Sequence, residues 1–563
     1  MALQTVTLTG DPSRWDKSHF APDSFDVIVA APPFRAADIG LPVCLDDVPH
    51  RAKGYLRWVK TWLTKAMKSL KPAGHFYVYG LPNWLPHFLN PLQEVLEFKY
   101  WIGIRSQGKR RTKSLVAEHM ALAFFAKPAS RFACNKVRYP HPICPVCERT
   151  VKDYGGRAHL LNPEGCLISD VWKDFNPDGL RGRLPAPVIE RVQELSDAFG
   201  KGRALILKPT GKEPPALEAQ TQLEFSYSGP KVDRDLLDQI HQDDSLEFMS
   251  RLPGGCTDLV FADPPYNLQK DYSNYSDDQE DERYLLWCRE WLAEYERILK
   301  PGGAMMVLNL PKWGIYHARE LSQHLHLRNW IVWDAHSEPK GRINPAHYTL
   351  LYFTKGPAPR VFNYASPGGK KEFDIPPPVA HIYCRRPQCR NKRKRNQFDD
   401  TAPLTDIWTD IHRLRHRRDR DQHPCQLPEA LMDRIIELTT MPGDIVLDAF
   451  GGAGTTALSA RKLGRRFICI EIDEEYVGLA RQKMVQVNLF GEVVRKTVKK
   501  GKRLEVMKKD LQLELVRLAR VLERPPTRED VIEHGKYPIE LYDDAFTTWS
   551  KALGAVRVMA RSE

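Results

Sequence analysis

The strongest constraint on the fold is an internal repeat that relates two halves of the sequence. Several segments of the first half have counterparts in the second half, in the same order and at a nearly constant offset of about 230 residues, which is unlikely to arise by chance. The sequence therefore predicts two homologous domains, at 1–222 and 223–492, followed by a smaller one at 493–563. The matching pairs are Phe25–Phe34 with Thr257–Tyr266, the segment from Tyr55 with that from Tyr284, and the segment from Ser169 with that from Thr405.

Each repeat has the pattern of an α/β domain. In the second one, short apolar runs rich in β-branched residues predict buried strands at DLVFA, AMMVLNL, DIVLDAF and RFICIEID. Helical spacing of apolar residues predicts a helix over Tyr284–Leu299 that stops at Lys-Pro-Gly-Gly, and another helix over TTALSARKLG. Strands that alternate with helices favour a parallel sheet. We therefore predict two tandem Rossmann-like, doubly wound α/β domains and a small C-terminal helical domain.

The motif with the clearest chemistry is Asp-Pro-Pro-Tyr-Asn, which directly follows the DLVFA run. Open α/β sheets place their sites at the carboxyl ends of strands. Because Pro264 and Pro265 have no backbone N–H, the segment offers mainly acceptors, namely carbonyls and the Asp263 carboxylate. Such a pocket suits a substrate NH₂ group, and Tyr266 offers a flat face for a base. The competing interpretation is a surface turn.

A second motif, VLDAFGGAGTT, predicts a nucleotide-cofactor loop. A strand ends at Asp448, and glycines that include Gly452 and Gly454 lead into a helix, where they let a ligand approach the backbone. Glu471, at the end of the next strand, can accept from ribose hydroxyls, and Phe450 can place a ring near a cationic cofactor. Since no Walker lysine follows the glycines, the pattern disfavours phosphoryl transfer.

Charge and hydropathy point to an intracellular protein with a polyanionic partner. The net charge is +12, and basic runs lie at Arg385–Arg395, Arg413–Arg420 and Arg495–Arg503. Clustered positive charge favours nucleic acid, although a solvated face is the commoner explanation of one run. The sequence shows neither a membrane-length apolar stretch nor a secretory signal pattern. We therefore expect a cytoplasmic, nucleoid-associated protein with no membrane partner.

Together, DPPYN, the later DAFGGAGTT and HPCQLPEAL from His423 resemble the β-class amino-methyltransferases of DNA, over about Asp235–Asn488. The resemblance implies S-adenosylmethionine as cofactor. By position it assigns catalysis to the DPPY residues and cofactor contacts to the glycine loop. Leu427-Pro428 replaces the Lys-Pro pair that is more usual in this family. The implied residues are Asp263, Pro264, Pro265 and Tyr266 for catalysis, and Asp244, Asp448, Phe450, Gly452, Gly454 and Glu471 for the cofactor.

The resemblance implies methyl transfer to adenine N6 of a flipped base in DNA, as in restriction-modification enzymes. In this family a leading Asp usually accompanies adenine and a leading Ser cytosine, so Asp263 favours adenine. N4-cytosine methylation, a non-catalytic DNA-binding scaffold and an RNA substrate remain the alternatives. A scaffold has no need to keep both motifs intact.

The first repeat has lost the groups that carry this chemistry. Its motif is Ala31–Phe34, without the carboxylate or the tyrosine, and Lys208 aligns with Asp448. Lys212 and Pro214 align with Gly452 and Gly454. We expect a degenerate, pseudoenzyme-like copy that forms an intramolecular pseudo-dimer with the active one. A higher oligomer of the whole chain is an open alternative.

The cysteines suggest a zinc site in the first repeat. Cys144 and Cys147 have the spacing of a metal knuckle, and His159 and Cys166 could complete four ligands. Cys384 and Cys389 lie in the second repeat without an obvious second pair. The alternative is reduced thiols without a metal.

The C-terminal tail predicts a small helical domain. Leu511, Leu515, Leu518 and Leu522 form an apolar stripe, and Thr527 begins a capping-box pattern. The tail resembles the helical repeat found beside homing endonucleases, which implies DNA contact. The alternative is a packing appendage.

Overall fold

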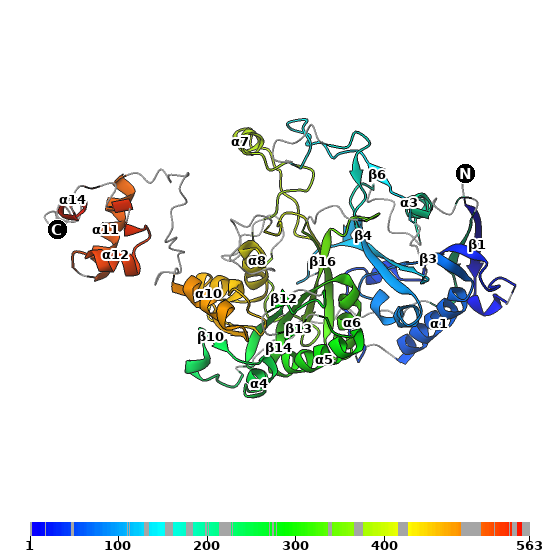
Figure 1. The fold of residues 1–563 in the computed structure, drawn as a ribbon, viewed down its shortest axis with the longest axis horizontal. Coiled ribbons are helices and arrows are strands. Elements are labelled where there is room, and N and C mark those ends of the chain that lie inside the picture. The colour runs from blue at the N-terminus through cyan, green and yellow to red at the C-terminus, as the bar shows by residue number, and fades with distance from the viewer. Residues whose placement is uncertain are drawn as a thin grey trace. The chain divides into compact units, whose positions relative to one another are not determined.

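The computed structural model divides the chain into two compact units. Unit 1 comprises Met1–Lys231, Met249–Leu414 and Glu437–Thr440, and unit 2 comprises Val232–Phe248, Arg415–Ile436 and Met441–Glu563. Both are shown in Figure 1. The structure describes residues 3–553 apart from 17, 47–49, 110, 112, 129–133, 153–160, 176–183, 197–199, 201, 213–226, 228, 269–270, 273–274, 277, 336–340, 365–374, 376, 415–425, 486–507, 523, 540, 543–545 and 547–548.

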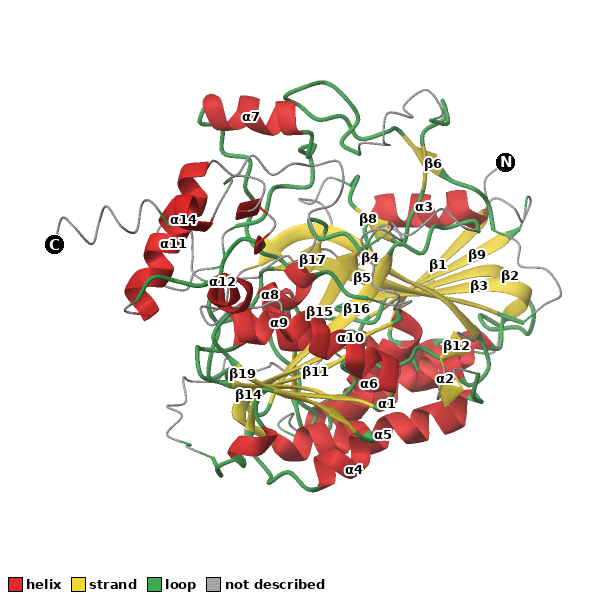
Figure 2. Ribbon diagram, turned by 60° about the vertical axis from the view of Figure 1, so that its left-hand side comes forward, coloured by secondary structure: helices red, strands yellow, loops and turns green. Residues whose placement is uncertain are grey.

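The first repeat forms a seven-stranded sheet with the order β1-β9-β2-β3-β5-β4-β8. Figure 2 shows β1, β9, β2 and β3 side by side. Strand β2 is buried along nearly its whole length, as its apolar sequence requires, and helix α1 packs against β2 and β3. The elements are β1 (Gln4–Gly10), β2 (Phe25–Ala30), α1 (His50–Met67), β3 (Leu70–Gly80), α2 (Asn90–Gln93), β4 (Glu97–Lys109), β5 (Ala117–Ala126), β6 (Arg138–Tyr139), β7 (Cys166–Leu167), β8 (Val171–Trp172), α3 (Ala186–Ser196) and β9 (Arg203–Pro209).

The second repeat contributes to both units. In unit 1 its strands run in the order β11-β14-β16-β15-β17, and in unit 2 strand β19 lies between β10 and β18. The elements are β10 (Gln239–Gln242), α4 (Ser245–Ser250), β11 (Thr257–Ala262), β12 (Asp271–Tyr272), β13 (Tyr275–Ser276), α5 (Asp281–Ile298), β14 (Leu299–Asn309), α6 (Pro311–Leu321), β15 (His326–Asp334), β16 (His347–Thr354), α7 (Pro387–Arg395), β17 (Ile407–Trp408), α8 (Glu429–Thr439), β18 (Ile445–Asp448), α9 (Thr455–Lys462), β19 (Arg466–Glu471) and α10 (Glu474–Val485).

The strand orders β2-β3-β5-β4-β8 and β11-β14-β16-β15-β17 correspond position by position. Neither set is wholly parallel, which corrects the prediction: β5 and β16 run antiparallel to both of their neighbours. In the first repeat the reason is the short connection from β4 to β5, over residues 110–116, whereas the connection from β15 to β16 in the second repeat covers residues 335–346. A parallel crossover needs a dozen or more residues, whereas an antiparallel return does not.

The strand beside β1 marks a difference between the repeats. Strand β9 pairs with both β1 and β2, whereas in unit 2 β10 is separated from β18 by β19. Among the described residues the first sheet has no counterpart of β19, the strand that ends at Glu471. In the first sheet β1 instead pairs directly with β9.

The two repeats contact each other within unit 1 through matched polar groups. Asp170 and Asp406 each accept a backbone N–H of the other repeat at 2.8 Å, and each lies 3.0 Å from a buried histidine. The partners are Ala346 and His347 for Asp170, and Glu118 and His119 for Asp406. Since equivalent residues make equivalent contacts in both directions, this contact has an approximate two-fold symmetry.

An aromatic pair lies in the same contact. Trp101 of β4 stacks on Trp330 of β15, with ring centroids 3.8 Å apart and planes inclined by 10°. Both indoles are fully buried. Burial of two such rings stabilises the contact between the repeats beyond its hydrogen bonds. Helix α6 of the second repeat also packs against β4 of the first.

The tail forms helices α11 (Lys508–Leu522), α12 (Arg528–His534) and α14 (Trp549–Ala552). The predicted stripe packs as expected, with Leu511, Leu515 and Leu518 buried in a small apolar cluster. The predicted capping box is confirmed, because Thr527 and Asp530 accept each other's backbone N–H. No helix in the described part of the chain is long and apolar enough to cross a membrane.

Candidate active site

The DPPY motif begins where the fully buried strand β11 ends, in unit 1. Asp263 is partly exposed, whereas Tyr266 is 7% exposed. The Tyr266 hydroxyl donates a hydrogen bond to Asp263 Oδ1. The acid and the aromatic ring predicted from the sequence therefore lie in direct contact.

Side chains of two helices donate hydrogen bonds to the main chain of the motif. The Tyr284 hydroxyl of α5 donates to the Pro265 carbonyl at 2.8 Å, and the Trp313 indole N–H of α6 donates to the Tyr266 carbonyl at 2.8 Å. Asn309 Nδ2 lies 3.2 Å from the Tyr284 hydroxyl oxygen. These bonds fix the backbone of the motif and thereby orient Asp263, although none of them involves its carboxylate.

A row of aromatic rings extends from the motif. The Tyr266 ring is 5.9 Å from that of Tyr348, and Tyr348 is 5.5 Å from Trp333, all between ring centroids. Tyr348 is partly exposed and offers a face on which a flat base can stack, whereas Trp333 is 2% exposed and packs against it from the interior. Sequence reasoning missed Tyr348 and Trp333, because they belong to β16 and β15 and no local motif marks them.

The glycine loop lies in unit 2, after β18. Asp448 is 3% exposed and accepts hydrogen bonds from the Thr456 hydroxyl at 2.5 Å and from the Phe450 N–H at 2.9 Å. Burial raises the pKa of Asp448 to about 6, although these two bonds oppose the shift. Asp448 therefore fixes the turn from β18 into α9.

The glycines are needed for their backbone conformation and for space. Gly452 and Gly454 have φ of 49° and 75°, in the left-handed region. A Cβ on Gly451 would come within 2.2 Å of Cys469 Sγ, and one on Gly454 within 2.7 Å of Ala480 Cβ. Only glycine therefore fits the close approach of this loop to β19 and α10.

Two further predicted acids flank the loop. Glu471 accepts the Gly452 N–H at 2.7 Å, and burial is the main reason why the pKa of Glu471 is raised. Asp244 is exposed and caps α4 by accepting the Leu246 N–H at 2.9 Å. The neighbouring Ser245 hydroxyl donates to the Ala449 carbonyl at 2.7 Å, which holds the Asp244 turn against the glycine loop.

The corresponding segment of the first repeat has a similar backbone support but different side chains. The Tyr55 hydroxyl donates to the Pro33 carbonyl at 2.5 Å, as Tyr284 does to Pro265. Ala31 and Phe34 stand in place of the acid and the tyrosine. Lys208 lies at the end of β9, with its Nζ 3.3 Å from the Leu184 carbonyl oxygen.

The predicted zinc ligand set needs correction. Cys144 and Cys147 lie close to Cys384 and Cys389, not to Cys166. Cys166 Sγ is instead 3.0 Å from His141 Nδ1. His159 lies outside the described residues.

The family model for DNA methylases matches residues 257–482. The type II methyltransferase M.BamHI of Bacillus amyloliquefaciens is 36% identical over 239 residues, which cover 42% of this chain and 55% of that protein. The type II methyltransferase M.HpaI of Haemophilus parainfluenzae is 32% identical over 245 residues, which cover 43% of this chain and 72% of that protein. The chain belongs to the DNA methylase family.

This DNA methylase is similar to a third relative, and its tail matches a second family model. The DNA adenine methyltransferase YhdJ of Escherichia coli (strain K12) is 29% identical over 263 residues, which cover 46% of this chain and 86% of that protein. The model of the homing endonuclease associated repeat matches residues 507–556. The aligned region thus spans about half of M.BamHI and most of the other two relatives.

Proposed function

We propose that this DNA methylase is a site-specific DNA methyltransferase that transfers a methyl group from S-adenosylmethionine to N6 of a flipped adenine. The observation that carries the proposal is the Asp263–Tyr266 pair at the carboxyl end of β11 in a chain of the DNA methylase family. The target atom is inaccessible inside a duplex, so the base must leave the stack. A chromosomal substrate would place the enzyme at the nucleoid.

The proposed role of Asp263 is to accept a hydrogen bond from the adenine amine. The lone pair of that amine is delocalised into the ring, and an acceptor at its N–H favours a nitrogen that can attack. In the structure the Tyr266 hydroxyl donates to this carboxylate. A bound base would replace that bond, which leaves the Tyr266 ring as a stacking face.

S-adenosylmethionine would supply an electrophilic methyl group on its sulfonium. The residues proposed to hold it are Phe450, Gly452 and Gly454 in the loop, with Glu471 at its ribose and Asp244 near its adenine. The loop suits a nucleoside cofactor because its glycines carry no side chains at the start of α9 and the acids beside it carry acceptor oxygens. The cofactor would give this methyl group to the amine nitrogen and leave as S-adenosylhomocysteine, and the nitrogen would release one proton.

The experiment that tests the function identifies the methylated base. Duplex DNA is incubated with the purified chain and S-adenosylmethionine, digested to nucleosides and measured by mass spectrometry. N6-methyladenine at one sequence motif supports the proposal, and Asp263→Ala should slow its formation by about 10²-fold or more. Detection of N4-methylcytosine would show that the enzyme methylates cytosine and not adenine. DNA binding without any methylated base would identify a scaffold instead.

We also propose that the first repeat is a degenerate methyltransferase domain that forms an intramolecular pseudo-dimer with the active one. The matched bonds of Asp170 and Asp406, the shared strand order and the bond from Tyr55 to Pro33 that matches the one from Tyr284 to Pro265 all favour a duplication. Without a counterpart of β19 among its described residues, the copy lacks the strand that would carry a ribose acid. One cofactor per chain is therefore expected.

The tail is proposed to contact DNA. Its match to the homing endonuclease associated repeat supports this role. Removal of residues 508–563 should weaken DNA binding and leave binding of S-adenosylhomocysteine unchanged. Unchanged DNA affinity would favour a packing role.

A further inference from the structure

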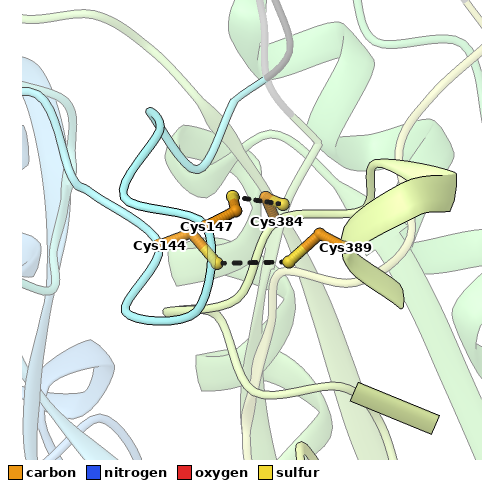
Figure 3. A group of neighbouring side chains, drawn as sticks. All are labelled: Cys144, Cys147, Cys384 and Cys389. Carbon is orange, nitrogen blue, oxygen red and sulfur yellow. Dashed lines mark hydrogen bonds between the residues drawn. The ribbon is translucent and has the colours of Figure 1, made fainter. Parts of the chain in front are cut away.

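Four cysteines from the two repeats converge in unit 1 (Figure 3). Their sulfur atoms all lie within 4.8 Å of one another. Cys144 Sγ is 3.8 Å from Cys389 Sγ, and Cys147 Sγ is 3.5 Å from Cys384 Sγ. Three of the four residues are buried, and Cys147 is partly exposed.

These distances fit a tetrahedral zinc site better than disulfides. A disulfide joins its sulfurs at about 2.05 Å. In a tetrahedron with zinc–sulfur bonds of about 2.3 Å, neighbouring sulfurs are about 3.8 Å apart. The observed pairs match the second value and exceed the first by more than 1 Å.

The local backbone also has the form of a metal knuckle. The chain from Ile143 to Thr150 folds back on itself, and the Glu148 N–H donates to the Cys144 carbonyl at 2.8 Å. Glu148 has a φ of 55°, in the left-handed region. This turn directs Cys144 and Cys147 to one side, at the C-x₂-C spacing that is typical of zinc ligands.

The second pair comes from the segment that leads into α7. Cys384 precedes the helix and Cys389 lies in its first turn, with four residues between them. Arg393, one turn later, donates from Nη1 to Cys389 Sγ at 3.1 Å and from Nε to Asp400 at 2.5 Å. An N–H donor to a sulfur disperses the negative charge that a tetrathiolate centre carries.

The other contacts of helix α7 are polar: Arg386, at its N-cap, donates to the Thr150 carbonyl at 2.6 Å and to the Lys152 carbonyl at 3.2 Å. Its sequence is PQCRNKRKR, and its buried residues are Cys389 and Arg393. A helix without an apolar face cannot be anchored by a hydrophobic core. Small segments that lack a core commonly use a metal for this purpose.

We propose that Cys144, Cys147, Cys384 and Cys389 bind one structural zinc ion that anchors α7 to the first repeat. The ion would join chain positions about 240 residues apart and present the exposed basic side chains of α7 in a fixed orientation. Those side chains are Arg390, Lys392, Lys394 and Arg395. This inference does not depend on the proposed methyl transfer.

The first test is the metal content of the full chain, purified under reducing conditions without added chelator. Elemental mass spectrometry should find about one zinc per chain. The double variant Cys384→Ser/Cys389→Ser should lose most of it, whereas the matched control Cys166→Ser should keep it. Cobalt substitution should give thiolate-to-metal charge-transfer absorption in the wild type and in the control only.

The second test concerns α7. Removal of zinc with a chelator, or the double variant, should speed tryptic cleavage within residues 387–395 by about tenfold or more, because the helix loses its anchor. Restored zinc should reverse this for the wild type. The proposal is overturned by wild-type protein without zinc, by alkylation under non-reducing conditions that reveals two disulfides, or by zinc that is lost in Cys166→Ser and kept in the double variant.

Discussion

Gly454 offers the sharpest test of the glycine loop. It lies at the N-cap of α9 with a φ of 75°. In Gly454→Ala, the new Cβ would meet Ala480 Cβ at 2.7 Å and Ala480 Cα at 3.1 Å. Neither atom can rotate away, since one is a methyl carbon attached directly to the backbone and the other is backbone. The strain must therefore be relieved by a shift of the loop or of α10.

The expected cost has two parts. The left-handed conformation costs an alanine about 1–2 kcal/mol, and overpacking costs about 1–3 kcal/mol. Gly454→Ala should therefore lower the unfolding free energy by about 2–5 kcal/mol. A shifted loop would also move the Gly452 N–H from Glu471. We expect affinity for S-adenosylhomocysteine to fall by about tenfold or more, equal to 1.4 kcal/mol.

Gly478→Ala is the matched control. Gly478 lies in α10, on an exposed position, and a Cβ there meets no atom within 4 Å. That substitution should be neutral or stabilising by up to about 1 kcal/mol. Urea denaturation followed by circular dichroism measures stability, and calorimetric titration measures affinity. Wild-type stability and affinity in Gly454→Ala would refute the geometry described for this loop.

Four other outcomes are expected. Asp263→Ala should lower the rate of methyl transfer by about 10²–10⁴-fold, with affinity for S-adenosylhomocysteine kept within about twofold; a near-normal rate would contradict the assigned role. Tyr266→Ala should weaken capture of the flipped base by about 1–3 kcal/mol, whereas Tyr266→Phe keeps the ring and should retain most of it, as measured with a fluorescent base at the target. Burial raises the pKa of Asp448 from 3.8 to about 6, so its stabilising contribution is complete below pH 4 and is lost as pH rises through 6. The wild type should therefore lose about 2–3 kcal/mol of unfolding free energy between about pH 4 and pH 7, and Asp448→Asn should not show this loss. Identical pH profiles of urea stability for the two proteins would count against this. Calorimetric titration with S-adenosylhomocysteine should give a stoichiometry of about one per chain that is abolished in Gly452→Lys, whereas a value of two would show that the first repeat also binds it.

Several features of the fold follow from local sequence. The helix predicted over Tyr284–Leu299 is α5, which spans Asp281–Ile298. The runs at β11, β18 and β19 are strands with buried residues, as their apolar content requires. The Lys-Pro-Gly-Gly segment does stop the helix, but it lies inside β14, where Gly302 takes a φ of 73°. Glycine allows the irregular register there, so one segment ends a helix and begins a strand.

The sequence by itself determined the features whose signal lies within a few residues: the DPPY motif, the glycine loop and the capping box. A strand and its following loop are adjacent in the chain, so neither needs a distant partner to be recognised. Only the tertiary structure decided which distant groups meet. Tyr348 joins Tyr266, Asp170 joins His347, and Cys384 and Cys389 complete the set begun by Cys144 and Cys147. The first contact depends on the pairing of β16, which carries Tyr348, with β14, and the other two join residues of different repeats. No spacing within one segment encodes such a contact, because its partners lie far apart in the chain and meet only when the sheets pack.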